Sequence, residues 1–226
     1  MKKDRNSFFM TWGERLFRVR SFTPIPLLLI MFFCRWWEWE NDILIWSIGL
    51  SLIILGENLR LWALRYIGKF SRTRKRKGRR LITDGPYAFT RNPLYCGNLL
   101  ILLGVTILSE LIWLIPIVII LFFLQYHCIV LWEEGVLLEH FPEDVEDYFQ
   151  SVPRWLPKWR IIRSHLQTHL TPRYSWANVL CREKSTLQFL VVMSIFLILK
   201  ELLDGNIVQN FSHLVNLMKI IYSTII

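Results

Sequence analysis

The sequence predicts an all-α protein, a polytopic transmembrane helical bundle of about five spans: two helical hairpins, a C-terminal helix and a polar segment on the cytoplasmic side. Three observations predict this fold. More than half of the 226 residues are hydrophobic (53%), the net charge is nevertheless +9, and long apolar runs alternate with basic loops. Soluble basic proteins rarely combine these properties, whereas apolar spans joined by basic loops explain them together.

The first hairpin is predicted in the N-terminal third of the chain. Residues 23–39 are apolar apart from Arg35 and Glu38, and end in a tryptophan cluster of the kind that favours a membrane interface. Residues 41–67 form a second run, long enough to cross a bilayer with some tilt. The short acidic turn at 38–42 would join the two helices.

Positive charge sets the predicted orientation. Residues 69–80 contain eight basic side chains in twelve, and the N-terminal twenty residues are also basic. The positive-inside rule places both in the cytoplasm, which agrees with a hairpin that returns the chain to its starting side. Nucleic-acid binding would be another use for this charge, but no polar domain is left to form such a site.

A second hairpin is predicted over residues 96–131, an apolar stretch too long for one crossing. Ser109 and Glu110 are its expected tip. Residues 132–184 are polar and rich in proline, and 187–199 form a further apolar segment. Residues 207–226 could be a sixth span, an interfacial helix or a packing element. We therefore expect a membrane core over 1–160 and a connector with membrane-associated helices over 161–226.

Common soluble cofactor motifs are absent from the sequence. It has no glycine-rich dinucleotide loop, P-loop, HExxH or nucleophile elbow. Its four cysteines form no CxxC pair, so we expect neither a zinc site nor a disulfide framework. Any cofactor site must therefore be built from helices and their connecting loops.

The first polar motif, residues 83–98, precedes the second hairpin. Its Gly-Pro and Asn-Pro pairs favour turns, and Pro93 suits the first turn of a helix whose free backbone N–H groups could bind an anion. The second motif, residues 133–157, opens on Glu133 and Glu134. Two adjacent carboxylates beside an apolar helix need solvent or a partner. Taken singly, the tyrosines could be interfacial anchors and the glutamates a hydrated helix end.

Together the two motifs resemble the isoprenylcysteine carboxyl methyltransferase and phospholipid methyltransferase superfamily of membrane enzymes. The first motif is matched by Gly85, Tyr87, Arg91, Asn92, Pro93 and Tyr95. The second is matched by Glu133, Glu134, Leu137, Phe141, Tyr148, Val152, Pro153, Leu156 and Pro157. The resemblance covers residues 57–157, with one departure: Asn92 stands where the superfamily motif has histidine, and an amide cannot titrate near neutral pH.

The resemblance implies S-adenosyl-L-methionine as cofactor and a lipid-like or prenylated substrate with a carboxylate, amine or thiol acceptor. The implied cofactor-binding residues are Gly85, Tyr87, Asn92, Pro93, Leu94, Tyr95, Gly97, Glu133 and Glu134. No residue stands out as a dedicated base, and Arg154 and Glu134 are the catalytic candidates. No metal and no nucleic acid are expected. The partners would be the bilayer and a lipid, with the active site facing the cytoplasm.

Two other functions remain open at the level of sequence. Related membrane reductases that use NADPH share this helical architecture, and a non-catalytic lipid-binding protein would need the same spans. Glu57 and Arg60, at helical spacing in the second span, could be a structural intramembrane pair or a polar wall for a substrate head group.

Overall fold

The computed structural model describes residues 2–34, 42–67, 81–156, 172 and 174–204, and all regular structure in this part of the chain is helical. The elements are α1 (Lys2–Val19), α2 (Ile25–Phe33), α3 (Asp42–Ile67), η2 (Gly85–Ala88), α4 (Pro93–Leu108), η3 (Ile112–Leu114), α5 (Ile115–His140), α6 (Pro142–Ser151) and α8 (Trp176–Asp204). The all-α prediction is confirmed. The predicted tryptophan cluster, acidic turn, basic run at 69–80, Pro157 and the 207–226 segment lie outside the described residues.

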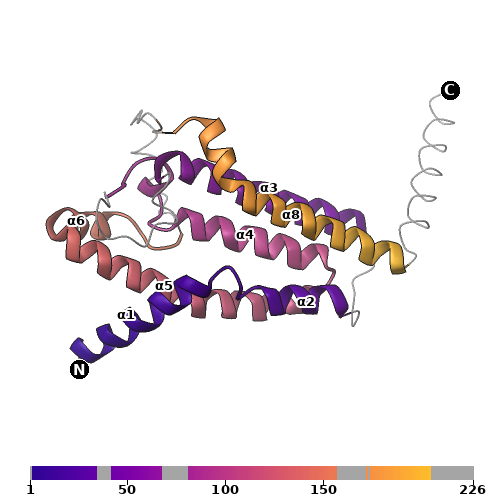
Figure 1. Ribbon diagram of the computed structural model, residues 1–226, viewed down its shortest axis with the longest axis horizontal. Coiled ribbons are helices and arrows are strands. Elements are labelled where there is room, and N and C mark those ends of the chain that lie inside the picture. The colour runs from indigo at the N-terminus through magenta and orange to yellow at the C-terminus, as the bar shows by residue number, and fades with distance from the viewer. Residues whose placement is uncertain (1, 35–41, 68–80, 157–171, 173, 205–226) are drawn as a thin grey trace.

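The helices form an elongated bundle (Figure 1). Helices α3, α4 and α5 lie along its length, α8 packs beside α3, and α1 packs on α5. Two helices are long and apolar enough to cross a membrane, Ile43–Ile67 and Ile112–His140. Only 22% and 28% of their most apolar windows are buried inside the protein. Most of their apolar side chains therefore face outward, as lipid-facing helices require.

Paired glycines hold α3 and α4 in close contact. A Cβ on Gly56 would lie 2.7 Å from the carbonyl oxygen of Gly97, and a Cβ on Gly97 would lie 2.7 Å from that of Gly56. One heptad further along, Gly49 and Gly104 meet in the same way, at 3.0 and 2.7 Å. Small residues at such contacts let two membrane helices approach through their backbones, which maximises van der Waals packing.

This glycine contact corrects the predicted first hairpin. The main partner of α3 is α4, while α2 contributes Met31 to a core cluster with Val105 of α4 and Val118 of α5. Helix α2 is also only nine residues long, which at about 1.5 Å per residue is far short of a bilayer core of about 30 Å. The expected pairing of 23–39 with 41–67 is therefore wrong, because the glycine faces of α3 and α4 pack more closely.

The second predicted hairpin has its tip where we expected it. Helix α4 ends at Leu108, and Glu110 adopts a left-handed conformation with φ of 64° that reverses the chain. Helix α5, however, continues to His140, beyond the predicted limit at 131. Glu133 and Glu134 thus lie inside a helix, where neighbouring residues such as Trp132 and Val136 are buried against the bundle.

The C-terminal helix is longer than the predicted apolar segment at 187–199. Helix α8 spans Trp176–Asp204. It therefore includes polar turns that precede the predicted apolar segment. Met193 packs in the same core cluster as Met31, and the rings of Phe32 and Phe196 meet edge to face at 4.9 Å. Helix α8 therefore belongs to the same packed bundle as the first hundred and fifty residues.

Candidate functional site

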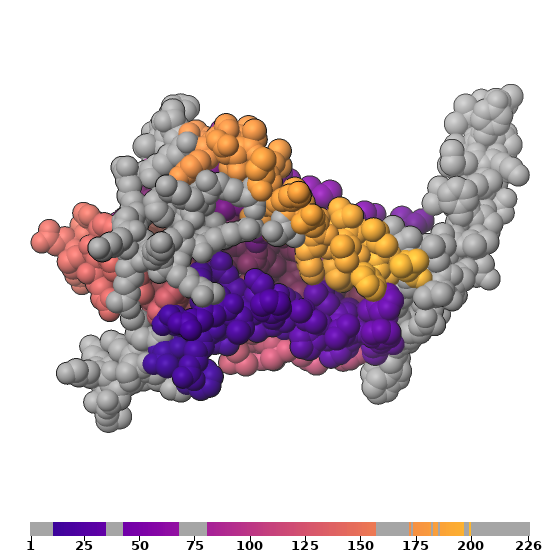
Figure 2. Space-filling model, viewed as in Figure 1, coloured from indigo at the N-terminus to yellow at the C-terminus, as the bar shows by residue number. Residues whose placement is uncertain are grey.

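A cavity of about 1250 Å³ lies within the bundle. The space-filling view shows the face hollowed between the α1–α2 region and α8, with α4 at the floor (Figure 2). Its polar lining includes Arg20, Arg60, Tyr87, Arg91, Asn92, Tyr95, Asn98, Tyr126, Glu133, Glu134, Tyr148 and Glu183. Its apolar lining includes Pro24, Leu27, Leu28, Ile101, Val105, Leu121, Phe122, Leu124 and Phe189. The cavity can thus accept an amphipathic molecule.

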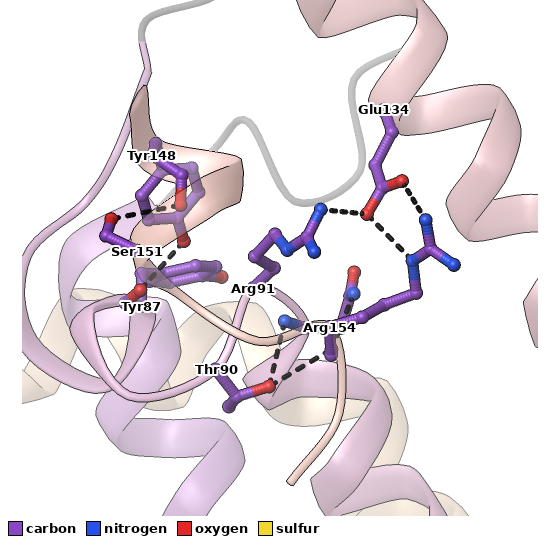
Figure 3. Close-up of polar contacts among 8 residues, drawn as sticks. Tyr87, Thr90, Arg91, Glu134, Tyr148, Ser151 and Arg154 are labelled. Atoms are coloured by element: carbon purple, nitrogen blue, oxygen red, sulfur yellow. Dashed lines mark hydrogen bonds and ion pairs between the residues drawn. The ribbon is translucent and has the colours of Figure 1, made fainter. Parts of the chain in front are cut away.

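The loop of the first motif is fixed by a glycine and by a tyrosine from α6. Gly85 has a φ of 61°, and a Cβ there would lie 2.4 Å from the ring of Tyr66. The hydroxyl of Tyr148 donates to the backbone oxygen of Tyr87 at 2.7 Å (Figure 3). Only glycine combines that conformation with that contact, so Gly85 shapes the loop that places Tyr87.

Asn92 joins the first motif to the second. Its side-chain amide donates to the backbone oxygen of Arg154 at 2.9 Å, and the hydroxyl of Thr90 donates to the same oxygen at 3.2 Å. The backbone N–H of Arg91 donates to the oxygen of Pro153 at 2.9 Å. Three hydrogen bonds therefore tie the loop before α4 to the chain after α6, and none of them needs a titrating side chain.

Glu134 lies between two guanidinium groups (Figure 3). Arg154 donates to both of its oxygens, at 3.0 and 2.6 Å, and Arg91 donates to Oε1 at 2.9 Å. Burial lowers the pKa of Arg91, and Glu134 opposes that shift. The guanidinium of Arg91 also sits 4.5 Å from the ring centre of Phe149. This bidentate geometry is the strongest kind of charge-assisted contact, so Glu134 fixes both arginines.

Glu133 faces a different set of groups. Its Oε2 accepts a hydrogen bond from the hydroxyl of Tyr95 at 3.0 Å, and Arg20 of the N-terminal segment donates to the same hydroxyl at 3.3 Å. The rings of Tyr95 and Tyr126 pack at 4.6 Å. Glu133 also lines the cavity, so its carboxylate can contact a ligand there.

Tyr87 offers the clearest unmet hydrogen-bonding group. The residue is 7% exposed and lines the cavity, and its hydroxyl has no hydrogen-bond partner among the described residues. Burial, together with the nearby Tyr148 and Glu133, raises the pKa of this hydroxyl well above its ordinary value. A buried phenol that stays protonated and lacks a partner costs free energy, unless a bound ligand accepts its hydrogen bond.

The structure brings most of the predicted cofactor residues to one cavity wall. The residues in its lining are Tyr87, Asn92, Pro93, Leu94, Tyr95, Glu133 and Glu134. Gly85 and Gly97 are not in the lining. Gly85 packs against the ring of Tyr66 and Gly97 against the backbone of α3, so both positions have a structural reason to be glycine. Arg154 is also outside the lining and reaches the site through Glu134.

Sequence reasoning missed Arg20, Tyr126 and Glu183 as cavity residues. Arg20 and Glu183 come from segments far along the chain from both motifs, so no local spacing links them to the site. Tyr126 lies seven residues before Glu133 on α5, and this spacing of about two helical turns could have indicated it.

A second polar cluster lies deeper in the bundle, around Arg60. Its guanidinium contacts Oε2 of Glu57 at 3.3 Å, Oε2 of Glu183 at 2.7 Å and the hydroxyl of Thr186 at 3.0 Å. It also donates to the amide oxygen of Asn98. The predicted pairing of Glu57 with Arg60 is therefore present, and α8 supplies a second carboxylate that the sequence did not reveal.

Comparison with known proteins supports the resemblance stated from the motifs. Residues 44–144 match the family model of the phospholipid methyltransferases. A protein-S-isoprenylcysteine O-methyltransferase B of Arabidopsis thaliana is 30% identical over 136 residues, which cover 54% of this chain and 61% of the relative. The predicted resemblance to this superfamily is confirmed.

Two bacterial relatives carry names from metal resistance. The nickel-cobalt-cadmium resistance protein NccN of Alcaligenes xylosoxydans xylosoxydans is 32% identical over 117 residues, covering 52% of this chain and 50% of the relative. The cobalt-zinc-cadmium resistance protein CzcN of Cupriavidus metallidurans is 33% identical over 132 residues, covering 57% and 56%. The matches thus span little more than half the length of these curated relatives. No solved structure gives a significant match.

Proposed function

We propose that this chain, whose core resembles the isoprenylcysteine carboxyl methyltransferase and phospholipid methyltransferase superfamily, is an integral membrane methyltransferase. It would transfer a methyl group from S-adenosyl-L-methionine to a lipid-like or prenylated acceptor. The observation that supports this most directly is the cavity of about 1250 Å³, which has both polar and apolar lining residues. Pockets for one drug-sized ligand measure about 300–1,000 Å³, so this cavity has room for a cofactor and an apolar substrate together.

The residues at the polar end fit the proposed cofactor. The unpartnered hydroxyl of Tyr87 suits a ligand acceptor, and the carboxylate of Glu133 suits an amino group, a ribose diol or a sulfonium. When bound, S-adenosyl-L-methionine supplies a methyl group on a good leaving group. The protein then has to align the acceptor with that methyl group and exclude water.

The apolar part supports a lipid-like acceptor. Leu28, Val105 and Phe122 line it at the depth of the spanning helices, where a hydrocarbon chain is as well solvated as in the bilayer. The basic N-terminal helix and the motif loops share one end of the bundle. By the positive-inside rule we place that end in the cytoplasm. The cofactor would arrive from the cytoplasm and the acceptor from the bilayer.

Cofactor titration separates this proposal from an NADPH-dependent reductase and from a non-catalytic lipid-binding protein. The purified chain in detergent is titrated with S-adenosyl-L-methionine and, separately, with NADPH in a calorimeter. The proposal predicts saturable binding of the first and none of the second. Binding of NADPH alone would favour the reductase, and binding of neither would leave a lipid-binding role.

A further inference from the structure

One carboxylate of the cluster around Arg60 lines the cavity, and only one of its oxygens is bound to Arg60. Glu183 is 2% exposed and lines the cavity, and its Oε2 is bound to Arg60. Its other oxygen, Oε1, takes no part in that contact and is not among the fully buried side-chain atoms that lack a partner, so it reaches the cavity surface. A hydrogen-bond donor on a bound molecule can contact it there.

The cluster lies next to the proposed cofactor end of the cavity. Tyr95, which donates to Glu133, packs its ring against Tyr126 at 4.6 Å. The hydroxyl of Tyr126 accepts from the amide of Asn98 at 3.3 Å, and the amide oxygen of Asn98 accepts from Arg60. One pair of packed, tilted rings thus separates Glu133 from the cluster, so a molecule held at Glu183 lies beside a cofactor held at Glu133.

The charges of the cluster select among acceptors. Arg60 is already contacted by two carboxylates, Glu57 and Glu183, so the ionised cluster has an excess of one negative charge. An acceptor that is itself a carboxylate would add a second negative charge in a region of low dielectric constant, next to a guanidinium that is already paired. An acceptor with an N–H or O–H group would instead donate to Oε1 of Glu183.

We propose that Glu183, held by Arg60, binds the methyl acceptor and takes its proton, and that the acceptor is a neutral amine or a phenol attached to an apolar chain. The inference rests on the proposed function. The lone pair of the acceptor nitrogen or oxygen forms the bond to the methyl carbon as the carbon–sulfur bond breaks, and that electron pair stays on sulfur. The acceptor proton passes to the carboxylate of Glu183, from which it later returns to solvent.

The test compares three acceptors of equal chain length in mixed micelles: hexadecylamine, para-hexadecylphenol and hexadecanoic acid. With labelled S-adenosyl-L-methionine, the wild-type protein should methylate the amine or the phenol and not the acid. Methylation of the acid alone would overturn this inference and leave the proposed function standing. Binding of S-adenosyl-L-methionine without transfer to any of the three would also overturn the inference, and absence of cofactor binding would overturn the proposed function first.

Variants at Glu183 separate a chemical role from a structural one. Glu183→Gln keeps the shape and can still accept from Arg60, whereas Glu183→Asp keeps the charge and shortens the side chain. If Glu183 takes the proton, turnover should fall about a hundredfold in the Gln variant and less in the Asp variant, with cofactor affinity unchanged in both. If it only ties α8 to α3, the Gln variant should be the more active of the two, and the inference is wrong.

The pH profile with the phenol gives a signature that a structural role does not predict. Without a carboxylate the phenol must ionise by itself, so the rate of Glu183→Gln should rise about tenfold per pH unit below the phenol pKa. The wild-type rate should depend on pH much less steeply. Glu143→Gln, the same change on the exposed surface of α6, is the control and should match the wild type. Parallel profiles for wild type and Glu183→Gln would contradict the inference.

Discussion

At the scale of single residues, the two adjacent glutamates have different surroundings and should respond differently to mutation. Glu134 holds Arg91 and Arg154, whereas Glu133 is bound by Tyr95 and lines the cavity. The sequence predicted that these carboxylates need solvent or a partner, because both adjoin an apolar helix. It could not predict that arginines of the protein itself satisfy Glu134, because Arg91 lies 43 positions away along the chain.

Glu133→Gln should weaken S-adenosyl-L-methionine binding by about 1–3 kcal/mol, because a charge-assisted hydrogen bond is lost. Its thermal stability should be close to that of the wild type. Glu134→Gln should chiefly affect folding. It should lose about 1–3 kcal/mol of folding stability, because two guanidinium groups lose their counter-ion. Calorimetric titration and thermal unfolding in detergent measure both quantities. Equal cofactor affinity in Glu133→Gln and wild type would refute the role given to Glu133.

Asn92 replaces the superfamily's histidine and works through its amide, which donates to the backbone oxygen of Arg154. Asn92→Leu has a similar volume but no donor, so it should leave that oxygen unpaired and cost about 1–3 kcal/mol. Asn92→His retains an N–H group and should keep most of the cofactor affinity. Titrating the three proteins with S-adenosyl-L-methionine tests this. Equal affinity for Leu and Asn would show that only the backbone matters at this position.

At the scale of elements, the contact between α3 and α4 determines where the site lies, because α3 supplies Arg60 and α4 supplies Tyr95 and Asn98. The sequence predicted that each of these helices exists, since their apolar runs are long. It predicted the wrong partner for α3, the segment at 23–39, because apolar composition gives length and no partner. The glycines at 49, 56, 97 and 104 decide the pairing, through backbone contacts that hydropathy does not register.

Gly97→Val should therefore separate α3 from α4. The added side chain would meet the backbone oxygen of Gly56 and the Cγ of Arg60, and overpacking of this kind costs about 1–3 kcal/mol. Thermal unfolding in detergent measures the loss. Leu55→Ala, at a residue of α3 that is 58% exposed, is the control and should change stability by less than about 0.5 kcal/mol. Similar unfolding temperatures for Gly97→Val and the control would contradict the packing argument.

At the scale of the whole molecule, the bundle joins segments far apart in sequence around one cavity. The motifs predicted most of its polar wall, because both lie at the ends of the α4–α5 hairpin. The contribution of α8 was not predictable, since Glu183 and Arg60 are 123 positions apart and no periodicity links them. A long-range ion pair of this kind depends on tertiary packing, which single-sequence patterns do not encode.

The proposed orientation makes a prediction for single cysteines introduced into a cysteine-free protein. An impermeant thiol reagent should label position 76 of the basic run from the cytoplasmic side only. Position 113, at the tip between α4 and α5 where Trp113 is 37% exposed, should be labelled from the opposite side only. Labelling in right-side-out and inverted vesicles provides the comparison. Labelling of both positions from one side would refute the arrangement.

Transfer of a methyl group into a lipid is the measurement that tests the central claim most directly. Membranes containing the wild-type chain, and membranes containing Glu133→Gln at equal expression, are incubated with methyl-labelled S-adenosyl-L-methionine and a total lipid extract. The account predicts a labelled, organic-soluble product that forms with the wild-type chain and is reduced in the variant. No labelled lipid above the level of membranes lacking the chain would contradict it.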